Sequence, residues 1–140
     1  MANQNPIQVG TPQVQTTFQI PATISGNHIT LTVRINLNAP GWSYVISNQI
    51  YLDGNDIYPT GTPAPSKLLL DTGAALNGKQ LMLLTKVTLI YAAGGVTTPP
   101  PVYTYTISID DGATNLGTFT ASSVSTYVTN FNSLLLFEQL

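Results

Sequence analysis

The sequence predicts an all-β fold, a single antiparallel β-sandwich of the jelly-roll or immunoglobulin-like type with about seven or eight strands. Three observations support this prediction. Apolar and polar residues alternate in several segments, turn-forming glycine, proline and asparagine separate these segments, and no segment carries a convincing helix signature. Together these features favour two packed sheets over a helical or mixed architecture.

The longest apolar run, residues 79–91, is expected to be the central strand of a sheet. It follows Asn77-Gly78, a tight-turn signal, and it ends before the glycine pair at 94–95. Its apolar residues fall on both faces, which predicts a sheet covered on both sides for part of its length. Val87 and Ile90 argue against a helix of the same length, because β-branched side chains favour strands.

The remaining strands are predicted from shorter patterns. Residues 28–37 alternate strictly, so one face of that strand lies on the core and the other in water. Further strands are expected over residues 14–20, 42–52, 68–70, 102–109 and 116–121. Residues 102–109 are expected to pair antiparallel with the central run. Residues 126–140 fit both a helical and an alternating spacing, and β-forming residues such as Val128 and Thr129 favour a strand.

The chain is expected to divide into a flexible N-terminal arm, residues 1–12, and a single β-sandwich domain, residues 13–140. The arm is polar, contains Pro6 and Pro12, and has no apolar core of its own. It is expected either to fray or to add a strand to the sheet edge of a neighbouring subunit. Residues 53–67 contain several prolines and are expected to form a long irregular loop of the kind that often carries function.

The low charge of the chain excludes some partners. Only 7% of the residues are Asp, Glu, Lys or Arg, against about a quarter in typical soluble domains. The four cations are too few and too scattered to neutralise a run of phosphates or to hold an anionic membrane surface, so nucleic-acid binding is not expected. A net charge of −2 gives little self-repulsion, and this favours association of the protein with itself.

Compartment is only weakly constrained by the sequence. The chain has no cysteine, so it has neither a disulfide framework nor a thiolate metal site. Its first residues lack the basic and apolar regions of a secretory signal, and no apolar stretch reaches the roughly 18 residues that a transmembrane helix needs. The expectation is therefore a cytoplasmic protein, or one that is exported by a non-classical route.

No pattern in the sequence predicts an enzyme. The single histidine, His28, stands at the start of a strand, and no nucleophile or acid accompanies it in a known motif. The adjacent carboxylates Asp110 and Asp111 precede Gly112 and are expected to form a turn. No glycine-rich phosphate loop and no nucleophile-elbow pattern is present.

A second carboxylate cluster could hold a metal ion. Asp53, Asn55 and Asp56 surround Gly54, and oxygen ligands around a glycine turn resemble part of a calcium loop. The spacing lacks the further Asp and the terminal Glu of an EF-hand. Turn formation is therefore the expectation, with a calcium site as the alternative and no other cofactor.

Four aromatic residues are the candidate ligand-binding set: Trp42, Tyr44, Tyr51 and Tyr58. They cluster in sequence around one predicted strand and the loop that follows it. Aromatic faces stack on sugar rings or form protein interfaces. The competing interpretation is that Trp42 and Tyr44 belong to the core and that Tyr51 and Tyr58 close the loop.

The leading hypothesis for function is a non-enzymatic β-sandwich that associates with itself, as a structural or interaction module. The alternative is a lectin-like domain that binds glycans, with or without calcium. A membrane-acting toxin subunit is a third hypothesis, although no separate amphipathic hairpin supports it. Charged residues usually guard sheet edges against pairing with other molecules, and their scarcity here favours the first hypothesis.

Overall fold

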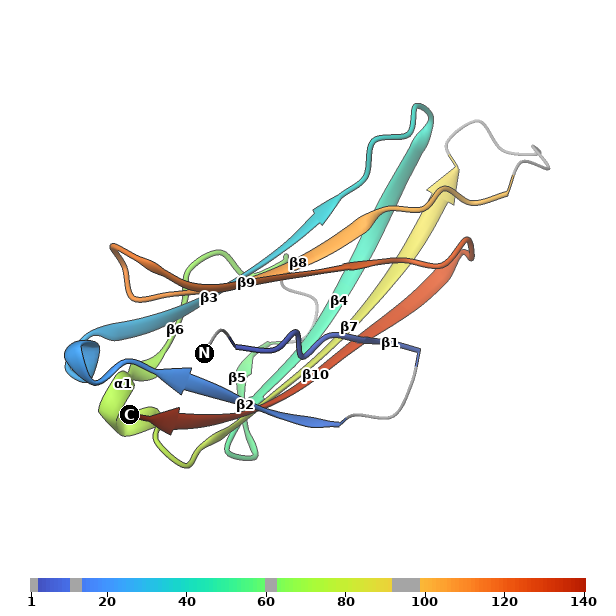
Figure 1. Ribbon diagram of the computed structural model, residues 1–140. Helices are drawn as coiled ribbons and strands as arrows, with labels where there is room; N and C mark the ends of the chain where they lie inside the picture. Colours follow the sequence, from blue (N-terminus) through green and yellow to red (C-terminus); the bar gives the residue numbers. More distant parts are fainter. Residues whose placement is uncertain (1–2, 11–13, 60–62, 92–98) are drawn as a thin grey trace.

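The computed structural model describes residues 3–10, 14–59, 63–91 and 99–140, and it shows two β-sheets packed face to face (Figure 1). Sheet A has the order β1-β10-β7-β4-β5 with β2 also beside β10, and sheet B has the order β6-β3-β8-β9. The strands of sheet A are β1 (Gln8–Val9), β2 (Gln15–Ile20), β4 (Trp42–Leu52), β5 (Asn55–Tyr58), β7 (Gln80–Tyr91) and β10 (Val128–Gln139). The strands of sheet B are β3 (His28–Asn36), β6 (Leu68–Thr72), β8 (Thr104–Asp110) and β9 (Asn115–Ser122).

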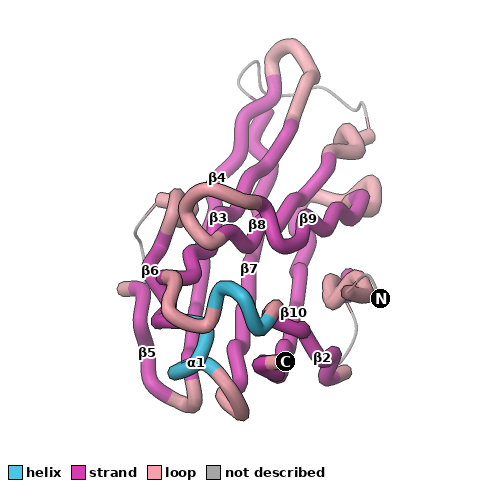
Figure 2. Tube along the Cα trace, turned by 60° about the vertical axis from the view of Figure 1, so that its left-hand side comes forward, coloured by secondary structure: helices cyan, strands magenta, loops and turns pink. Residues whose placement is uncertain are grey.

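The predicted β-sandwich is confirmed. The described residues contain ten strands rather than seven or eight, because the short strands β1 and β5 lie in segments that were expected to be an arm and a loop. The helical elements are one 3-10 turn, η1 (Ala22–Ile24), and one short helix, α1 (Gly73–Leu76). Figure 2 shows α1 and the C-terminus together at one end of the sandwich.

The predicted central strand is confirmed as β7. It pairs antiparallel with β4 from Trp42↔Tyr91 to Leu52↔Leu81, and with β10 from Val128 to Leu136. Its inner-face leucines and valine are buried against sheet B, whereas its outer face is half-buried or exposed. No further layer covers that outer face within the part of the chain described here, so the expectation of a sheet covered on both sides is wrong.

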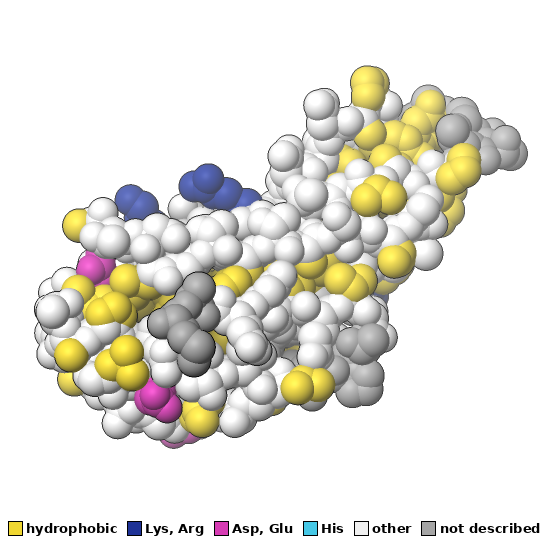
Figure 3. Space-filling model, in the orientation of Figure 1, with side chains coloured by type: hydrophobic (Ala, Val, Ile, Leu, Met, Phe, Trp, Pro, Cys, Tyr) yellow, Lys and Arg dark blue, Asp and Glu magenta, His cyan; other side chains and the backbone are white. Residues whose placement is uncertain are grey.

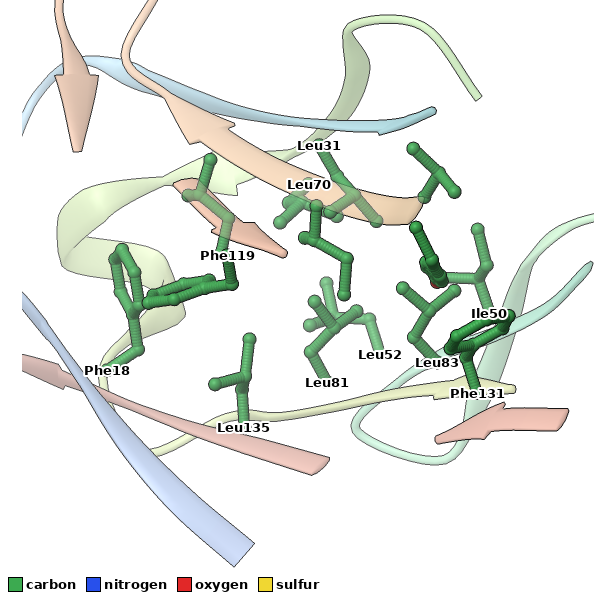
Figure 4. Packing of buried hydrophobic residues seen from close by; sticks show 14 of the residues in the cluster. Phe18, Leu31, Ile50, Leu52, Leu70, Leu81, Leu83, Phe119, Phe131 and Leu135 are labelled. Atoms are coloured by element: carbon green, nitrogen blue, oxygen red, sulfur yellow. The ribbon is translucent and has the colours of Figure 1, made fainter. Parts of the chain in front are cut away.

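The core lies between the sheets, and large apolar side chains from both of them meet there (Figure 4). Phe18 of β2 packs edge-on against Phe119 of β9, with ring centroids 6.1 Å apart. Phe131 of β10 packs edge-on against Tyr105 of β8 at 4.3 Å. Edge-to-face packing favours such aromatic pairs beyond the area that they bury. Each pair joins one sheet to the other.

A row of polar side chains crosses this apolar core. The Thr85 hydroxyl on β7 donates to Asn48 Oδ1 on β4 (2.8 Å) and accepts from the Tyr105 hydroxyl of sheet B (2.8 Å). All three side chains are buried, and Asn48 Nδ2 has no hydrogen-bond partner among the described residues. A buried network of this kind favours one register, because any slip leaves more polar groups unpaired.

Two of the predicted pairings differ in the structure. Residues 102–109 were expected to pair with the central run, but β8 lies in sheet B between β3 and β9. The connection from Tyr91 to Thr104 is long enough to cross between the sheets, whose faces pack about 10 Å apart. β2 runs parallel to β10, whereas the other paired strands are antiparallel. The ambiguous segment 126–140 is a strand, β10, as its β-forming residues predicted.

The N-terminal segment lies against the sandwich from Asn3 to Gly10. β1 pairs antiparallel with β10 of the same chain (Gln8↔Asn132), so its strand is added within the chain rather than to a neighbouring subunit. Pro6 is buried, and the Asn5 side chain donates to the Thr120 carbonyl of β9 (3.0 Å). The division at residues 12 and 13 stays a prediction.

The buried Tyr105 hydroxyl predicts a stability loss at alkaline pH. Burial raises the pKa of Tyr105 well above the ordinary value, whereas in the unfolded chain the group ionises near pH 10. The contribution of the buried, neutral hydroxyl to the free energy of unfolding is therefore complete below about pH 10, and it is lost as the pH rises beyond that value. We expect Tyr105→Phe to cost about 1 kcal/mol at neutral pH. Above pH 10, the stability of the Tyr105→Phe variant should fall less steeply than that of the wild type. The difference between the two slopes should reach up to about 1.4 kcal/mol per pH unit.

Urea unfolding at a series of pH values measures this slope. The matched control is Tyr127→Phe, because that side chain is exposed, and it should leave the slope unchanged. Equal slopes of stability against pH above pH 10 for the wild type and Tyr105→Phe would contradict the assignment of the alkaline loss to the buried Tyr105 hydroxyl.

Candidate functional site

Sheet A is longer than sheet B at one end. There β4 and β7 project beyond the strands of sheet B (Figure 1). Tyr44 points to the inner face of β4 but is 40% exposed, whereas Ile50 on the same face is fully buried. We call this part of the sandwich the distal end, and it comprises residues 37–46, 87–91, 99–103 and 123–129. It lies opposite the end that carries α1 (Figure 2).

Three aromatic rings cluster at the distal end. The centroid of Trp42 lies 4.9 Å from that of Tyr91 and 6.0 Å from that of Tyr127. The turn before β4 positions Trp42, and its backbone N–H donates to the Ala39 carbonyl (3.2 Å). Gly41 has a φ of +81°, and a Cβ at this position would lie 3.2 Å from the Tyr91 ring. The turn therefore needs glycine both for its conformation and for the packing of the cluster.

Exposed aliphatic side chains lie on the opposite face of sheet A from this cluster and near the ends of two strands of sheet B. On the outer face, Val45 of β4 and Val128 of β10 flank Thr88, and Ile90 lies in the next row of the sheet. Val45 is 55% exposed, and Val102 and Val124 are exposed near the ends of β8 and β9. Figure 3 shows hydrophobic side chains gathered over the projecting end.

The distal end carries no charge. Three long segments of the sequence, residues 35–52, 87–109 and 112–137, contain no Asp, Glu, Lys or Arg. All four cations and all six anions lie outside these segments, although Arg34 is only two residues before the end of β3 that leads to the distal end. In the view of Figure 3 the charged side chains lie on the body of the sandwich, away from the projecting end. Neither exposed charge nor its hydration shell protects this apolar surface from association.

The structure separates the four predicted aromatic residues into two groups. Trp42 and Tyr44 lie at the distal end, while Tyr51 and Tyr58 lie at the other end of β4. Tyr51 is nine positions after Trp42 along an extended strand, a distance of about 30 Å. These residues therefore do not form one site.

Two members of the distal cluster were missed by the sequence analysis. Tyr91 and Tyr127 join Trp42 only through the register of β4 with β7 and the connection into β10. The available signal was the absence of charge over three separate segments, parts of which the fold brings to the distal end.

The predicted metal-ligand set forms a hairpin turn. Asp53 and Gly54 have φ values of +51° and +84° and connect β4 to β5, the geometry of a tight type I′ turn. Asp56 accepts a hydrogen bond from the Tyr58 N–H (3.0 Å), and Asn55 pairs with Leu52. The described part of the chain holds no group of three or more His, Cys, Asp or Glu side chains that could bind a metal.

The other candidate chemical groups also have structural positions. His28 is exposed at the start of β3. Asp111 accepts from the backbone N–H groups of Thr114 and Ala113, and these bonds lower the pKa of its carboxyl group. Asp111 thus stabilises the turn between β8 and β9, as predicted for the Asp110-Asp111 pair.

The outer face of sheet A also carries a shallow polar hollow of about 240 Å³. Lys86 of β7 lies in it, between Ser47 of β4 and Asn130 of β10 in the same row of the sheet. Gln49 and Asn132 lie in the adjacent row, and one row further along the sheet is Tyr51. Amide and hydroxyl groups beside an aromatic ring are the usual contacts of a sugar.

Known proteins do not assign a function. No protein-family model matches the chain, and neither a curated protein sequence nor a solved structure is significantly similar to it. No helix within the described residues is long and apolar enough to cross a membrane.

Gly41→Ala is expected to disrupt the distal cluster. The substitution strains a backbone at positive φ and pushes a methyl group against Tyr91, so we expect a loss of roughly 1–2 kcal/mol of stability. Trp42 is the only tryptophan in the chain, so its fluorescence should shift to longer wavelength. The control is Gly26→Ala, where φ is ordinary and the added Cβ meets no atom within 4 Å. An unshifted spectrum for Gly41→Ala would contradict the assigned packing.

Proposed function

We propose that this protein is a non-enzymatic interaction module that associates with itself through the distal end. The observation that carries the proposal is the coincidence, at one end of the sandwich, of exposed apolar side chains and a complete absence of charge. Monomeric proteins rarely expose large contiguous apolar patches, and such patches mark interaction surfaces.

The chemistry of the distal end favours a like surface as its partner. Burial of exposed apolar area contributes about 25 cal/mol per Å², and the rigid rings of Trp42 and Tyr127 lose little conformational entropy on contact. Two identical uncharged surfaces meet without electrostatic repulsion. A partner with a strongly charged surface would instead lose hydration without gaining an ion pair.

Val45→Lys should weaken self-association. A lysine here places a charge in the apolar surface, and burying it against a second copy costs desolvation and like-charge repulsion. We expect the midpoint concentration of association to rise at least about tenfold, or 1.4 kcal/mol. Size-exclusion chromatography with light scattering over a concentration series measures this midpoint.

The matched control is Leu69→Lys, which replaces a side chain of similar exposure (56%) on β6 in sheet B. This substitution should leave the midpoint unchanged. A wild-type protein that stays monomeric at the highest concentration reached would contradict the proposal, and so would equal effects of the two lysine variants.

A second candidate function is glycan binding at the polar hollow on the outer face of sheet A. The supporting observation is the row of Ser47, Lys86 and Asn130, with Tyr51 close by on the same face. Of the four aromatic residues that the sequence predicted for ligand binding, only Tyr51 belongs to this site. The Asp53 turn, the predicted calcium position, lies outside it. The bound sugar would stack on the ring and receive hydrogen bonds from the amides.

A glycan array, with and without calcium, tests this second candidate. We expect Asn130→Ala to reduce binding to any positive glycan at least about tenfold, the loss of one or two hydrogen bonds to the sugar. The control Asn115→Ala removes an exposed amide at the start of β9 and should have no effect. The absence of any positive glycan, or equal binding by both variants, would contradict this function.

A further inference from the structure

Strand β4 has an open edge over most of its length. On one side it pairs with β7 along its whole length, from Trp42 to Leu52. On the other side β5 pairs with it only from Ile50 to Leu52. From Trp42 to Gln49, no strand among the described residues lies on that side.

The backbone groups on this open edge belong to alternate residues. The Asp53 N–H donates to the Gln80 carbonyl (2.7 Å), which fixes the pattern of the ladder with β7. Odd-numbered residues of β4 exchange hydrogen bonds with β7 in this pattern, so Tyr44, Ile46 and Asn48 direct their N–H and C=O groups to the open side. Within the described chain, those groups take part in no backbone hydrogen bond outside the ladder.

The usual protections of an edge strand are missing here. The open stretch contains no charged residue and no proline, and the register shift of β4 with β5 comes only after it, between Ile50 and Tyr51. Inward-pointing charges, prolines and bulges are the features that normally prevent an edge from pairing with another chain. An unprotected edge of this length is therefore complementary to a further strand.

Parts of three other strands are covered by the chain itself: β10, β9 and β3. β1 and β2 both lie along β10, and Asn5 donates to a carbonyl on the free side of β9. Beyond the end of β6, the N–H of Val33 on β3 donates to the Pro65 carbonyl (2.9 Å). Among the open edges of the described strands, that of β4 runs through the distal end, so self-association of the distal end through a strand edge would involve β4.

We propose that the open edge of β4 pairs antiparallel with β4 of a second copy, about a two-fold axis that passes between the two copies of Val45. This inference rests on the proposed self-association and adds its geometry. Tyr44, Ile46 and Asn48 must face their counterparts, so residues of the same parity lie opposite each other. The register that uses the whole open stretch places Trp42 opposite Asn48 and Val45 opposite Val45.

The side chains favour this arrangement over pairing with an unrelated strand. Tyr44 would lie opposite Ile46 of the other copy, and aromatic with β-branched pairs stabilise antiparallel strands. Because the axis is two-fold, that contact occurs twice. Two valines meet at the axis on the outer face, and two Ser43–Ser47 pairs flank them without charge repulsion. Such an isologous contact closes after two copies, so a dimer is the expected product.

Disulfide cross-linking tests the register directly, because the natural chain contains no cysteine. Position 45 would face itself in a non-hydrogen-bonded pair, where the Cα atoms lie about 4.5 Å apart, within the range of a disulfide. We expect Val45→Cys to form a disulfide-linked dimer under mild oxidation. Ser43→Cys alone should not, whereas a mixture of Ser43→Cys and Ser47→Cys should give the mixed dimer.

The matched control is Thr118→Cys, an exposed position on β9, the edge strand of sheet B. It should cross-link at least about tenfold more slowly than Val45→Cys.

A second pair of variants separates the contribution of the β4 backbone from that of the Tyr44 side chain. Tyr44→Pro and Tyr44→Ala both remove the ring, but only proline removes the outward N–H, and an edge strand tolerates that loss. We expect the proline variant to associate at least tenfold more weakly than the alanine variant.

The outcomes separate the pairing from the proposed function. If the wild type associates but Val45→Cys cross-links no faster than Thr118→Cys, the β4 pairing is wrong and self-association stands. If cross-linking is selective for Ser43→Cys alone, a different register holds and the axis at Val45 is overturned. If light scattering shows only monomer at every concentration, both the proposed function and this inference fail.

Discussion

The antiparallel pairing of β7 with both β4 and β10 is the interaction on which the rest of the structure depends. It decides which side chains of three long strands face sheet B, because a shift of one residue would turn the buried set of each strand to solvent. It also extends past the end of sheet B. The same ladder that builds the core thus creates the distal end and leaves its inner face partly uncovered.

The buried row of Asn48, Thr85 and Tyr105 complements that ladder. Its first hydrogen bond connects neighbouring strands of sheet A, and its second crosses to sheet B, so it fixes both the register and the position of one sheet over the other. A wholly apolar core would tolerate small displacements of the sheets more easily. Asn48 Nδ2 has no hydrogen-bond partner in the described part of the chain, and this buried donor is the energetic cost of the arrangement.

Period-two alternation predicted the long strands and the β-sandwich, because strands with one buried face are encoded locally. Pairing is not local. The sequence placed β8 beside β7 and missed the parallel contact of β2 with β10, since both depend on which sheet a connection reaches. The aromatic set was grouped by nearness in sequence, but Trp42 lies at one end of β4 and Tyr58 lies on β5 beside the other end. An extended strand separates its ends further than any other element of the same number of residues. The charge-free segments were visible in the sequence, and only the fold shows that they converge.

β1 and β2 both pair with β10, and these pairings affect the order in which the chain folds. β1 and β2 complete sheet A only by pairing with β10, and Gln19 lies 119 positions before its partner Glu138. During synthesis β1 and β2 therefore have no strand partner until β10 is made. Such distant pairing makes folding slow, and until it is complete the apolar face of β2 stays exposed. The rate-limiting step of folding is expected to be this last closure of first strand on last.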